Sequence, residues 1–146
     1  SRSYYDKNPI LIGILNGSFI FMSDLIRQLN IDCEIDFIKI SSYAGKKSTG
    51  NISMSKGLDL DIKNRSVIIV EDIIDSGKSI NYLYDFISNL NPKDIAVISL
   101  LAKKNVSKLK FKIDFIGFEI SSEFVVGYGL DYKQKLRNLK SIYKLI

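Results

Sequence analysis

Unbroken apolar runs recur along this chain at intervals that suit a buried sheet. Residues 10–15 (ILIGIL) and 67–70 (VIIV) contain no polar side chain, which is typical of strands that are buried on both faces. Residues 95–101 and 115–120 predict two further buried strands, the last with Gly117 inside it. Because such strands need cover on both faces, the pattern favours a parallel sheet between layers of helices.

Two segments between these runs have the spacing of amphipathic helices. After the turn residues 16–18, one helical face is apolar, made of Met22, Leu25, Ile26 and Leu29. After residues 71–79 a second apolar face follows, made of Ile80, Leu83, Ile87 and Leu90, and Asn91-Pro92 ends that helix. Strands that alternate with helices predict a single α/β domain over residues 1–146, with a Rossmann-like parallel sheet flanked by helices.

The region from residue 34 to residue 57 begins with one more strand and then loses its pattern. Residues 34–40 predict a strand in which Ile35 and Phe37 alternate with Asp36. From about 41 to 57, Ser, Gly, Lys, Thr and Asn dominate, and a structureless segment of this length inside a compact domain is usually a functional loop. We therefore expect a flexible lid over about 41–57, with a plain surface excursion as the alternative.

The composition narrows the class of protein before any motif is considered. Apolar residues are 46% and charged residues 25% of the chain, a mix typical of a soluble globular domain. No apolar run approaches the ~18 residues of a membrane helix, so no membrane partner is expected. The net charge of +5 suits nucleic acids or phosphorylated small molecules, but the lysines are scattered, which favours a solvated surface and no nucleic-acid partner.

Two residue types are informative because they are scarce. The chain has no histidine, which excludes catalytic triads and zinc sites that use one. Proton transfer must therefore use Asp, Glu, Lys, Tyr or water. The single cysteine, Cys33, excludes an internal disulfide and suits a reducing cytoplasmic location.

The segment VIIVEDIIDSGKSI, residues 67–80, places the chemistry at a strand end. Glu71 and Asp72 follow the apolar run, and residues 75–79 (DSGKS) precede the second helix. In open α/β sheets ligands bind where strands end and a following helix presents free N–H groups. Gly77 permits close backbone approach, and the hydroxyls of Ser76 and Ser79 add donors, so the turn is suited to a phosphate.

An ATP-binding P-loop is the obvious alternative, because Gly77-Lys78-Ser79 matches its last three residues. That motif also needs a glycine five positions earlier, where this chain has Asp72. Acids beside a phosphate turn instead suit a sugar phosphate, since carboxylates accept hydrogen bonds from ribose hydroxyls and help to hold magnesium. The plainer interpretation is that Glu71, Asp72 and Asp75 are solvated loop acids.

Four segments in order resemble one enzyme family. They are LNGSFIFMSDL from Leu15, SSYAGKKSTG from Ser41, VIIVEDIIDSGKSI from Val67 and FIGFEISSEFVVGYGLDY from Phe115. The third closely resembles the 5-phosphoribosyl-1-pyrophosphate (PRPP) signature of the phosphoribosyltransferases, and the chain from Pro9 onward resembles their hypoxanthine–guanine branch. The resemblance implies the type I phosphoribosyltransferase fold and transfer of the phosphoribosyl group from PRPP to hypoxanthine or guanine. The products would be IMP or GMP and pyrophosphate, as in purine salvage.

The resemblance also implies roles for individual residues. Asp75 is implied as the general base beside N7 of the purine, Glu71 and Asp72 as ligands of the ribose hydroxyls near magnesium, and residues 75–79 as the 5-phosphate loop. Lys103 is implied as donor to the 6-oxo group, with Phe124 stacking on the purine and the Val125 backbone at the ring edge. The remaining implied positions are Asn16, Gly17 and Arg137 for pyrophosphate, Asp131 for a second Mg²⁺, and Ser42 and Tyr43 for the lid.

Two departures and two alternatives accompany this resemblance. Family members usually carry a helix and a strand before Pro9, so the N-terminal part of a small hood over the base is expected to be missing, and Asn16 replaces a common lysine or arginine. A nucleotide-sensing regulator that binds nucleic acid is one alternative, although the chain has no basic stripe. A generic dinucleotide module is the other, although its glycine fingerprint is absent. The resemblance further implies a homodimer or homotetramer.

Overall fold

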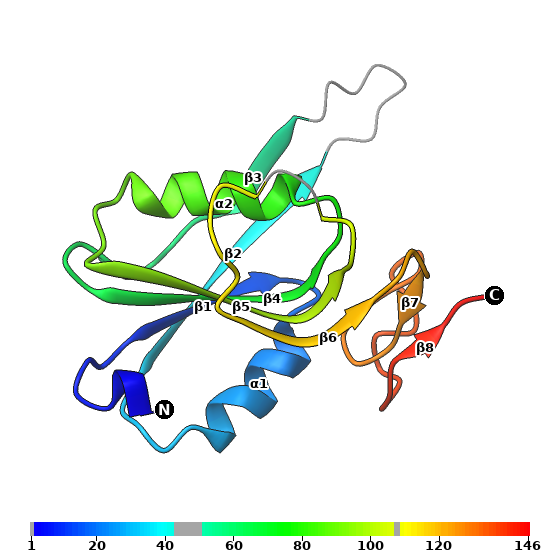
Figure 1. Ribbon diagram of the computed structural model, residues 1–146, viewed down its shortest axis with the longest axis horizontal. Coiled ribbons are helices and arrows are strands. Elements are labelled where there is room, and N and C mark those ends of the chain that lie inside the picture. The colour runs from blue at the N-terminus through cyan, green and yellow to red at the C-terminus, as the bar shows by residue number, and fades with distance from the viewer. Residues whose placement is uncertain (1, 43–50, 107–108) are drawn as a thin grey trace.

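The computed structural model describes residues 2–42, 51–106 and 109–146, and its centre is a six-stranded sheet (Figure 1). The strand order is β3-β2-β1-β4-β5-β6. The strands are β1 (Ile10–Leu15), β2 (Glu34–Ser42), β3 (Ile52–Lys56), β4 (Ser66–Ile74), β5 (Asp94–Lys103) and β6 (Phe115–Ile120). All neighbouring pairs are parallel except β2 and β3, so the predicted parallel sheet carries one antiparallel edge strand.

Two helices cover opposite faces of this sheet, as Figure 1 shows. Helix α1 (Phe19–Gln28) follows β1, and helix α2 (Lys78–Ser88) follows β4; a short 3₁₀ turn, η1 (Arg2–Tyr4), precedes the sheet. Both helices lie where the apolar spacing predicted them, and α2 ends ahead of Asn91-Pro92 as expected.

The alternation within each central strand explains its unbroken apolar sequence. In β1, Ile10, Ile12 and Ile14 belong to the core cluster that contains Ile80, Leu83 and Ile87 of α2. Leu11 belongs to a second cluster, which contains Met22 of α1. Since side chains point to the two faces in turn, a strand between two helical layers must be apolar at every position.

The prediction that β6 is buried on both faces is wrong. This strand is the edge of the sheet, and Phe115 and Phe118 are 60% and 64% exposed. Apart from Glu119 its sequence is apolar like that of a central strand, and its place at the edge of the sheet leaves both phenylalanines exposed. Neither α1 nor α2 covers it fully in the described part of the chain.

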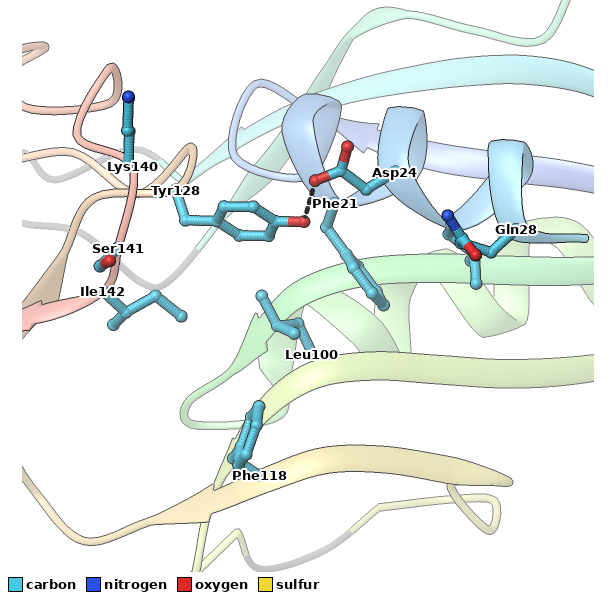
Figure 2. Close-up of a pocket in the computed structure, with 10 residues that line it drawn as sticks. Phe21, Asp24, Gln28, Leu100, Phe118, Tyr128, Lys140, Ser141 and Ile142 are labelled. Atoms are coloured by element: carbon cyan, nitrogen blue, oxygen red, sulfur yellow. Dashed lines mark hydrogen bonds between the residues drawn. The ribbon is translucent and has the colours of Figure 1, made fainter.

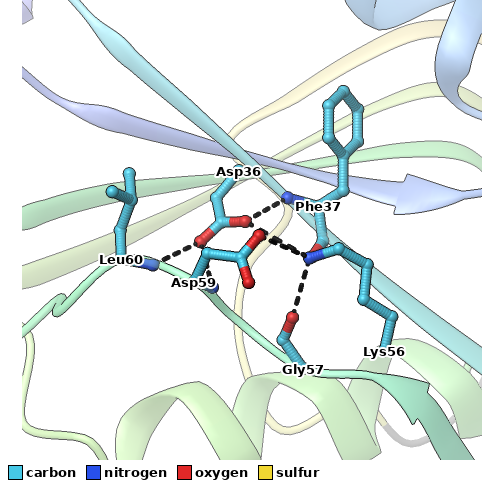
Figure 3. Close-up of polar contacts among 6 residues, drawn as sticks. All are labelled: Asp36, Phe37, Lys56, Gly57, Asp59 and Leu60. Atoms are coloured by element: carbon cyan, nitrogen blue, oxygen red, sulfur yellow. Dashed lines mark hydrogen bonds and ion pairs between the residues drawn. The ribbon is translucent and has the colours of Figure 1, made fainter.

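The predicted alternation in β2 is present, but its buried member next to Ile35 is the acid. Asp36 is 4% exposed, whereas Ile35 is 44% exposed. Asp36 is buried because its carboxylate accepts backbone N–H groups: Phe37 N lies 2.7 Å from Oδ1, and Asp59 N and Leu60 N each lie 2.8 Å from Oδ2 (Figure 3). A buried carboxylate with these partners can replace an apolar residue in a strand.

The expectation of a structureless lid over about 41–57 needs correction at both ends. Strand β2 continues to Ser42, and residues 52–56 form β3, in which Ile52 and Met54 are half-buried while Ser53 and Ser55 are exposed. Only two apolar residues support this alternation, so the segment was too short to be recognised as a strand from its sequence. Tyr43 and the rest of the predicted lid to residue 50 lie outside the described residues.

The chain after β6 forms a small sheet of β7 (Val125–Val126) and β8 (Tyr143–Lys144), which Figure 1 shows beyond the end of β6. In the part of the chain that the structure describes, no helix has the length and apolar character required to cross a membrane. The carboxyl ends of β4 and β5 and the segment from Glu123 to Asp131 meet at one edge, where the predicted site residues lie.

Candidate active site

The paired acids lie inside β4, two and three residues from its end, and not in a turn as predicted. The strand continues to Ile74 because Ile73 and Ile74 pair with Leu101 and Ala102 of β5. Glu71 is 6% exposed, and this burial, together with the charge of Asp72, raises the pKa of the Glu71 carboxyl well above its usual value.

The phosphate turn follows at once, between Asp75 and α2. Gly77 has φ +85°, a left-handed conformation that favours glycine, and α2 begins at the next residue. The N-cap residue Gly77 makes no side-chain cap, and the N–H of Lys78 donates to Oγ of Ser76 at 3.4 Å. A hydrogen bond of that length is weak, so the N-terminus of α2 can still receive an anion. A small cavity of about 80 Å³ lies here, lined by residues that include Glu71, Ser76, Gly77 and Ser79.

A second cavity, of about 190 Å³, adjoins the phosphate turn and collects the predicted purine and catalytic residues. Its lining consists of Asp72, Ile73, Asp75, Lys103, Glu123, Phe124, Val125, Leu130 and Asp131. Ile73 and Asp75 line both cavities, so the two cavities adjoin one another.

Lys103 and Asp75 form an ion pair across this cavity. Nζ of Lys103 lies 3.0 Å from Oδ1 of Asp75, and the two side chains are 20% and 64% exposed. Lys103 is the last residue of β5, and Asp75 follows the last residue of β4, so the parallel pairing of these strands brings them together. A proton acceptor and a fixed cation therefore face the same space.

The opposite wall comes from the small sheet and the residues around it. Phe124 is 52% exposed and meets the ring of Tyr132 edge-on, with 6.0 Å between ring centroids. Val125 begins β7, which pairs with β8. An exposed aromatic face held beside a paired strand can stack on a planar ring.

Asp131 and Arg137 also interact directly. Nη2 of Arg137 lies 3.5 Å from Oδ1 of Asp131, and Nη1 donates to the carbonyl oxygen of Gly129 at 2.7 Å. Arg137 therefore contacts the rim residue Asp131 but lines neither cavity among the described residues.

The loop after β1 approaches the acids from the other side. The peptide bond between Leu15 and Asn16 is cis. Gly17 lies so close to Asp72 that a Cβ at position 17 would be 1.8 Å from Oδ2 of Asp72. Of the predicted lid residues, Ser42 is the last residue of β2, and nothing is described of its side chain.

The arrangement of acids suits one kind of metal. Glu71 and Asp72 are adjacent carboxylates whose repulsion a cation would relieve, and Asp131 lines the same cavity as Asp72. Within residues 2–42, 51–106 and 109–146, no group of three or more His, Cys, Asp or Glu side chains could hold a metal by itself. This donor set fits Mg²⁺, which takes one or two carboxylates and completes its shell with substrate oxygens and water.

Some residues of the site were not predicted. Glu123 and Leu130 line the larger cavity, and Tyr128 joins this region to α1 by a hydrogen bond to Asp24. Adjacency to Phe124 could have pointed to Glu123. No local signal connects positions 24 and 128, because their contact depends on the tertiary fold.

The chain resembles known proteins over nearly its whole length. A family model described as phosphoribosyl transferase domain matches residues 1–133. The hypoxanthine phosphoribosyltransferase of Buchnera aphidicola is 48% identical over 142 residues, which cover 96% of this chain and 80% of that protein.

Solved structures agree with this comparison. A hypoxanthine-guanine phosphoribosyltransferase from Bacillus anthracis has a TM-score of 0.92 and 39% identity, covering 99% of this chain and 86% of that one. The hypoxanthine phosphoribosyltransferase of Trypanosoma cruzi in complex with its product IMP has a TM-score of 0.88 and 36% identity, covering 97% and 77%.

Proposed function

This chain belongs to the phosphoribosyltransferase family, and we propose that it is a hypoxanthine phosphoribosyltransferase of purine salvage. It transfers the 5-phosphoribosyl group from PRPP to hypoxanthine, and to guanine in the same way, releasing pyrophosphate. The observation that carries the proposal is the 190 Å³ cavity in which Asp75, Lys103, Phe124 and Asp131 meet beside the phosphate turn.

The reaction forms a bond between N9 of the purine and C1′ of the ribose while the bond from C1′ to pyrophosphate breaks. The purine loses its N7 proton, and we assign that proton to the carboxylate of Asp75. Lys103 donates to the 6-oxo oxygen, and its ammonium has three N–H groups, so it can do so while it stays beside Asp75. A general base such as Asp75 contributes about 10²–10⁴-fold.

Lys103 also provides a reason to exclude adenine. A 6-oxo group accepts a hydrogen bond from the lysine, whereas a 6-amino group offers a second donor. A buried donor left unpaired costs about 1–3 kcal/mol. Phe124 holds either ring by stacking, and the Val125 backbone lies at the ring edge.

The sugar phosphate is proposed to occupy both cavities. Residues 75–79 hold the 5-phosphate with the first N–H groups of α2, the hydroxyls of Ser76 and Ser79, and Lys78. Glu71 and Asp72 accept hydrogen bonds from the ribose hydroxyls. Magnesium, when bound near Glu71, Asp72 and Asp131, would neutralise charge on the departing pyrophosphate.

Pyrophosphate itself is proposed to lie against the loop of Asn16 and Gly17, with Arg137 nearby. Asn16 supplies no cation there, so binding would depend on backbone groups. Ser42 and Tyr43 are proposed to begin the lid that excludes water. The resemblance and the single cysteine support action in the cytoplasm, and the resemblance supports a homodimer or homotetramer.

The test is turnover of hypoxanthine with PRPP and Mg²⁺, followed by the variant Asp75→Asn. We expect activity in the wild type, and in Asp75→Asn a fall in kcat of about 10²-fold with the affinity for PRPP within about threefold. Asp32→Asn, an exposed acid ahead of β2 at the opposite end of the sheet, is the control and should be unchanged. A wild type inactive on hypoxanthine and guanine would refute the proposal.

A further inference from the structure

The turn of residues 127–129 follows the predicted purine-binding wall, which is formed by Phe124 and Val125, and contacts two other parts of the molecule. All three residues have left-handed backbone, with φ +93° at Gly127, +52° at Tyr128 and +98° at Gly129. A Cβ at position 129 would stand 2.5 Å from the carbonyl oxygen of Gly17. The turn therefore touches the loop proposed to bind pyrophosphate, backbone against backbone.

One side chain of this turn reaches further. The hydroxyl of Tyr128 donates a hydrogen bond to Oδ2 of Asp24 on α1, and Arg27 forms an ion pair with the other carboxylate oxygen of Asp24. Figure 2 shows the Tyr128 ring extending from the turn toward α1, with its hydroxyl directed at Asp24. Both side chains border a cavity of about 500 Å³ between α1, β6 and residues 140–142.

The placement of Asp24 gives this hydrogen bond its meaning. Helix α1 begins at Phe19, directly after the loop of Asn16 to Ser18, so a contact to α1 fixes the rigid element that carries that loop. The turn of Tyr128 lies between Phe124 and Asp131, which line the 190 Å³ cavity beside the phosphate turn. Gly17 touches both Gly129 and Asp72, so the turn already contacts the loop that precedes α1. The hydrogen bond from Tyr128 to Asp24 adds a second contact, between the same turn and α1 itself.

We propose that Tyr128 and Asp24 are positioning residues, whose hydrogen bond holds the purine-binding wall in register with the pyrophosphate loop. This inference rests on the function proposed above. Neither residue touches substrate; each acts through a backbone segment that does. Loss of the bond should therefore weaken binding at both ends of the site and leave the proton transfer at Asp75 nearly unchanged.

The electrostatics of the pair keep the bond intact at neutral pH. Burial of the ring and the hydrogen bond to Asp24 raise the pKa of Tyr128 to about 12, so the hydroxyl remains a donor. The hydrogen bonds from Tyr128 and Arg27 lower the pKa of Asp24, which remains a charged acceptor. A hydrogen bond between a neutral donor and a carboxylate is stronger than one between two neutral groups.

The experiment compares steady-state kinetics of five variants with the wild type at 25 °C, together with their thermal melting temperatures. Tyr128→Phe and Asp24→Ala each remove the hydrogen bond, and the double variant removes both partners. Asp24→Asn keeps an oxygen acceptor at that position. Tyr143→Phe, at an exposed tyrosine of the small sheet that adjoins the turn, is the matched control.

We expect Tyr128→Phe and Asp24→Ala to raise the KM for PRPP and the KM for hypoxanthine by about tenfold, equivalent to about 1.4 kcal/mol, with kcat within about threefold. The double variant should be no worse than either single variant, because the two changes remove one interaction. Asp24→Asn and Tyr143→Phe should stay within about threefold of the wild type in both KM values.

The contrary outcomes are distinct from one another. If the melting temperature of Tyr128→Phe falls but both KM values stay unchanged, the bond is merely structural and the inference is overturned. If only the hypoxanthine KM rises, Tyr128 serves the purine alone and the coupling of the two loops is overturned. An inactive wild type would overturn the proposed function itself, and with it the premise of this inference.

Discussion

Gly17 offers the most direct test of how closely the pyrophosphate loop and the paired acids are packed. Replacing it with alanine adds one methyl group. That methyl carbon would stand 1.8 Å from Oδ2 of Asp72 and 2.6 Å from its Cγ. Atoms cannot approach so closely, so the carboxylate of Asp72 must move.

The size of the movement sets the expected effect. An ordinary van der Waals contact is about 3.4–4 Å, so Oδ2 must move away by more than about 1.5 Å. A misplacement of about 1 Å in a group that orients a reacting substrate can reduce the rate by about 10²-fold. The cost in stability should be smaller, about 1–2 kcal/mol, because the carboxylate ends a side chain that can rotate.

The assay measures kcat/KM for PRPP, with the free energy of unfolding from urea titration as a parallel reading. Gly17→Ala should lose about 10²-fold in kcat/KM while remaining folded. Gly57→Ala is the matched control, since a Cβ at position 57 would lie 3.6 Å from Sδ of Met54, an ordinary contact. Its kcat/KM should stay within about twofold of the wild type.

The reasoning fails if Gly17→Ala keeps its kcat/KM within about threefold of the wild type. Such a result would mean either that Asp72 can give way without harm or that its position does not matter to the reaction. A loss of activity accompanied by complete unfolding would contradict the estimate that the carboxylate can rotate aside.

Two further predictions concern buried acids. Asp36→Ala leaves the N–H groups of Asp59 and Leu60 without their carboxylate and should lower the free energy of unfolding by about 3–5 kcal/mol in urea titration. Asp59→Ala, whose side chain is 80% exposed, should cost less than about 1 kcal/mol, and equal losses would contradict the account. Because the pKa of Glu71 is raised from 4.5 on folding, its protonated form contributes stability that is present below pH 4.5 and lost as the pH rises through the folded pKa. Glu71→Gln should therefore be more stable than the wild type at pH 8 without metal, with the difference disappearing near pH 4.5; a constant difference in urea midpoint would refute this.

Comparison of β6 with β1 shows where hydrophobic pattern stops being sufficient. Both strands are apolar along most of their length, yet β1 is central and buried while Phe115 and Phe118 of β6 are exposed. The hydrophobic pattern shows which side chains of a strand are apolar enough to be buried. The position of the strand in the sheet decides which of them are covered by other elements. Asp36 presents the converse case, since its burial depends on N–H groups more than twenty residues away.

The start of the strand at Val67 and the turn at Gly77 could be predicted from local chemistry, because β-branched residues favour a strand and Gly77 suits a left-handed turn before a helix. The end of the strand could not, because its last residues are held by pairing with β5. The resemblance added Lys103 and Phe124, which the structure brings to one cavity with Asp75. The contacts of Gly17 with Asp72 and Gly129, and of Tyr128 with Asp24, could not be derived in this way. Local sequence encodes the preferences of short segments, whereas these contacts join segments from 55 to more than 100 residues apart and arise only when the whole sheet is assembled.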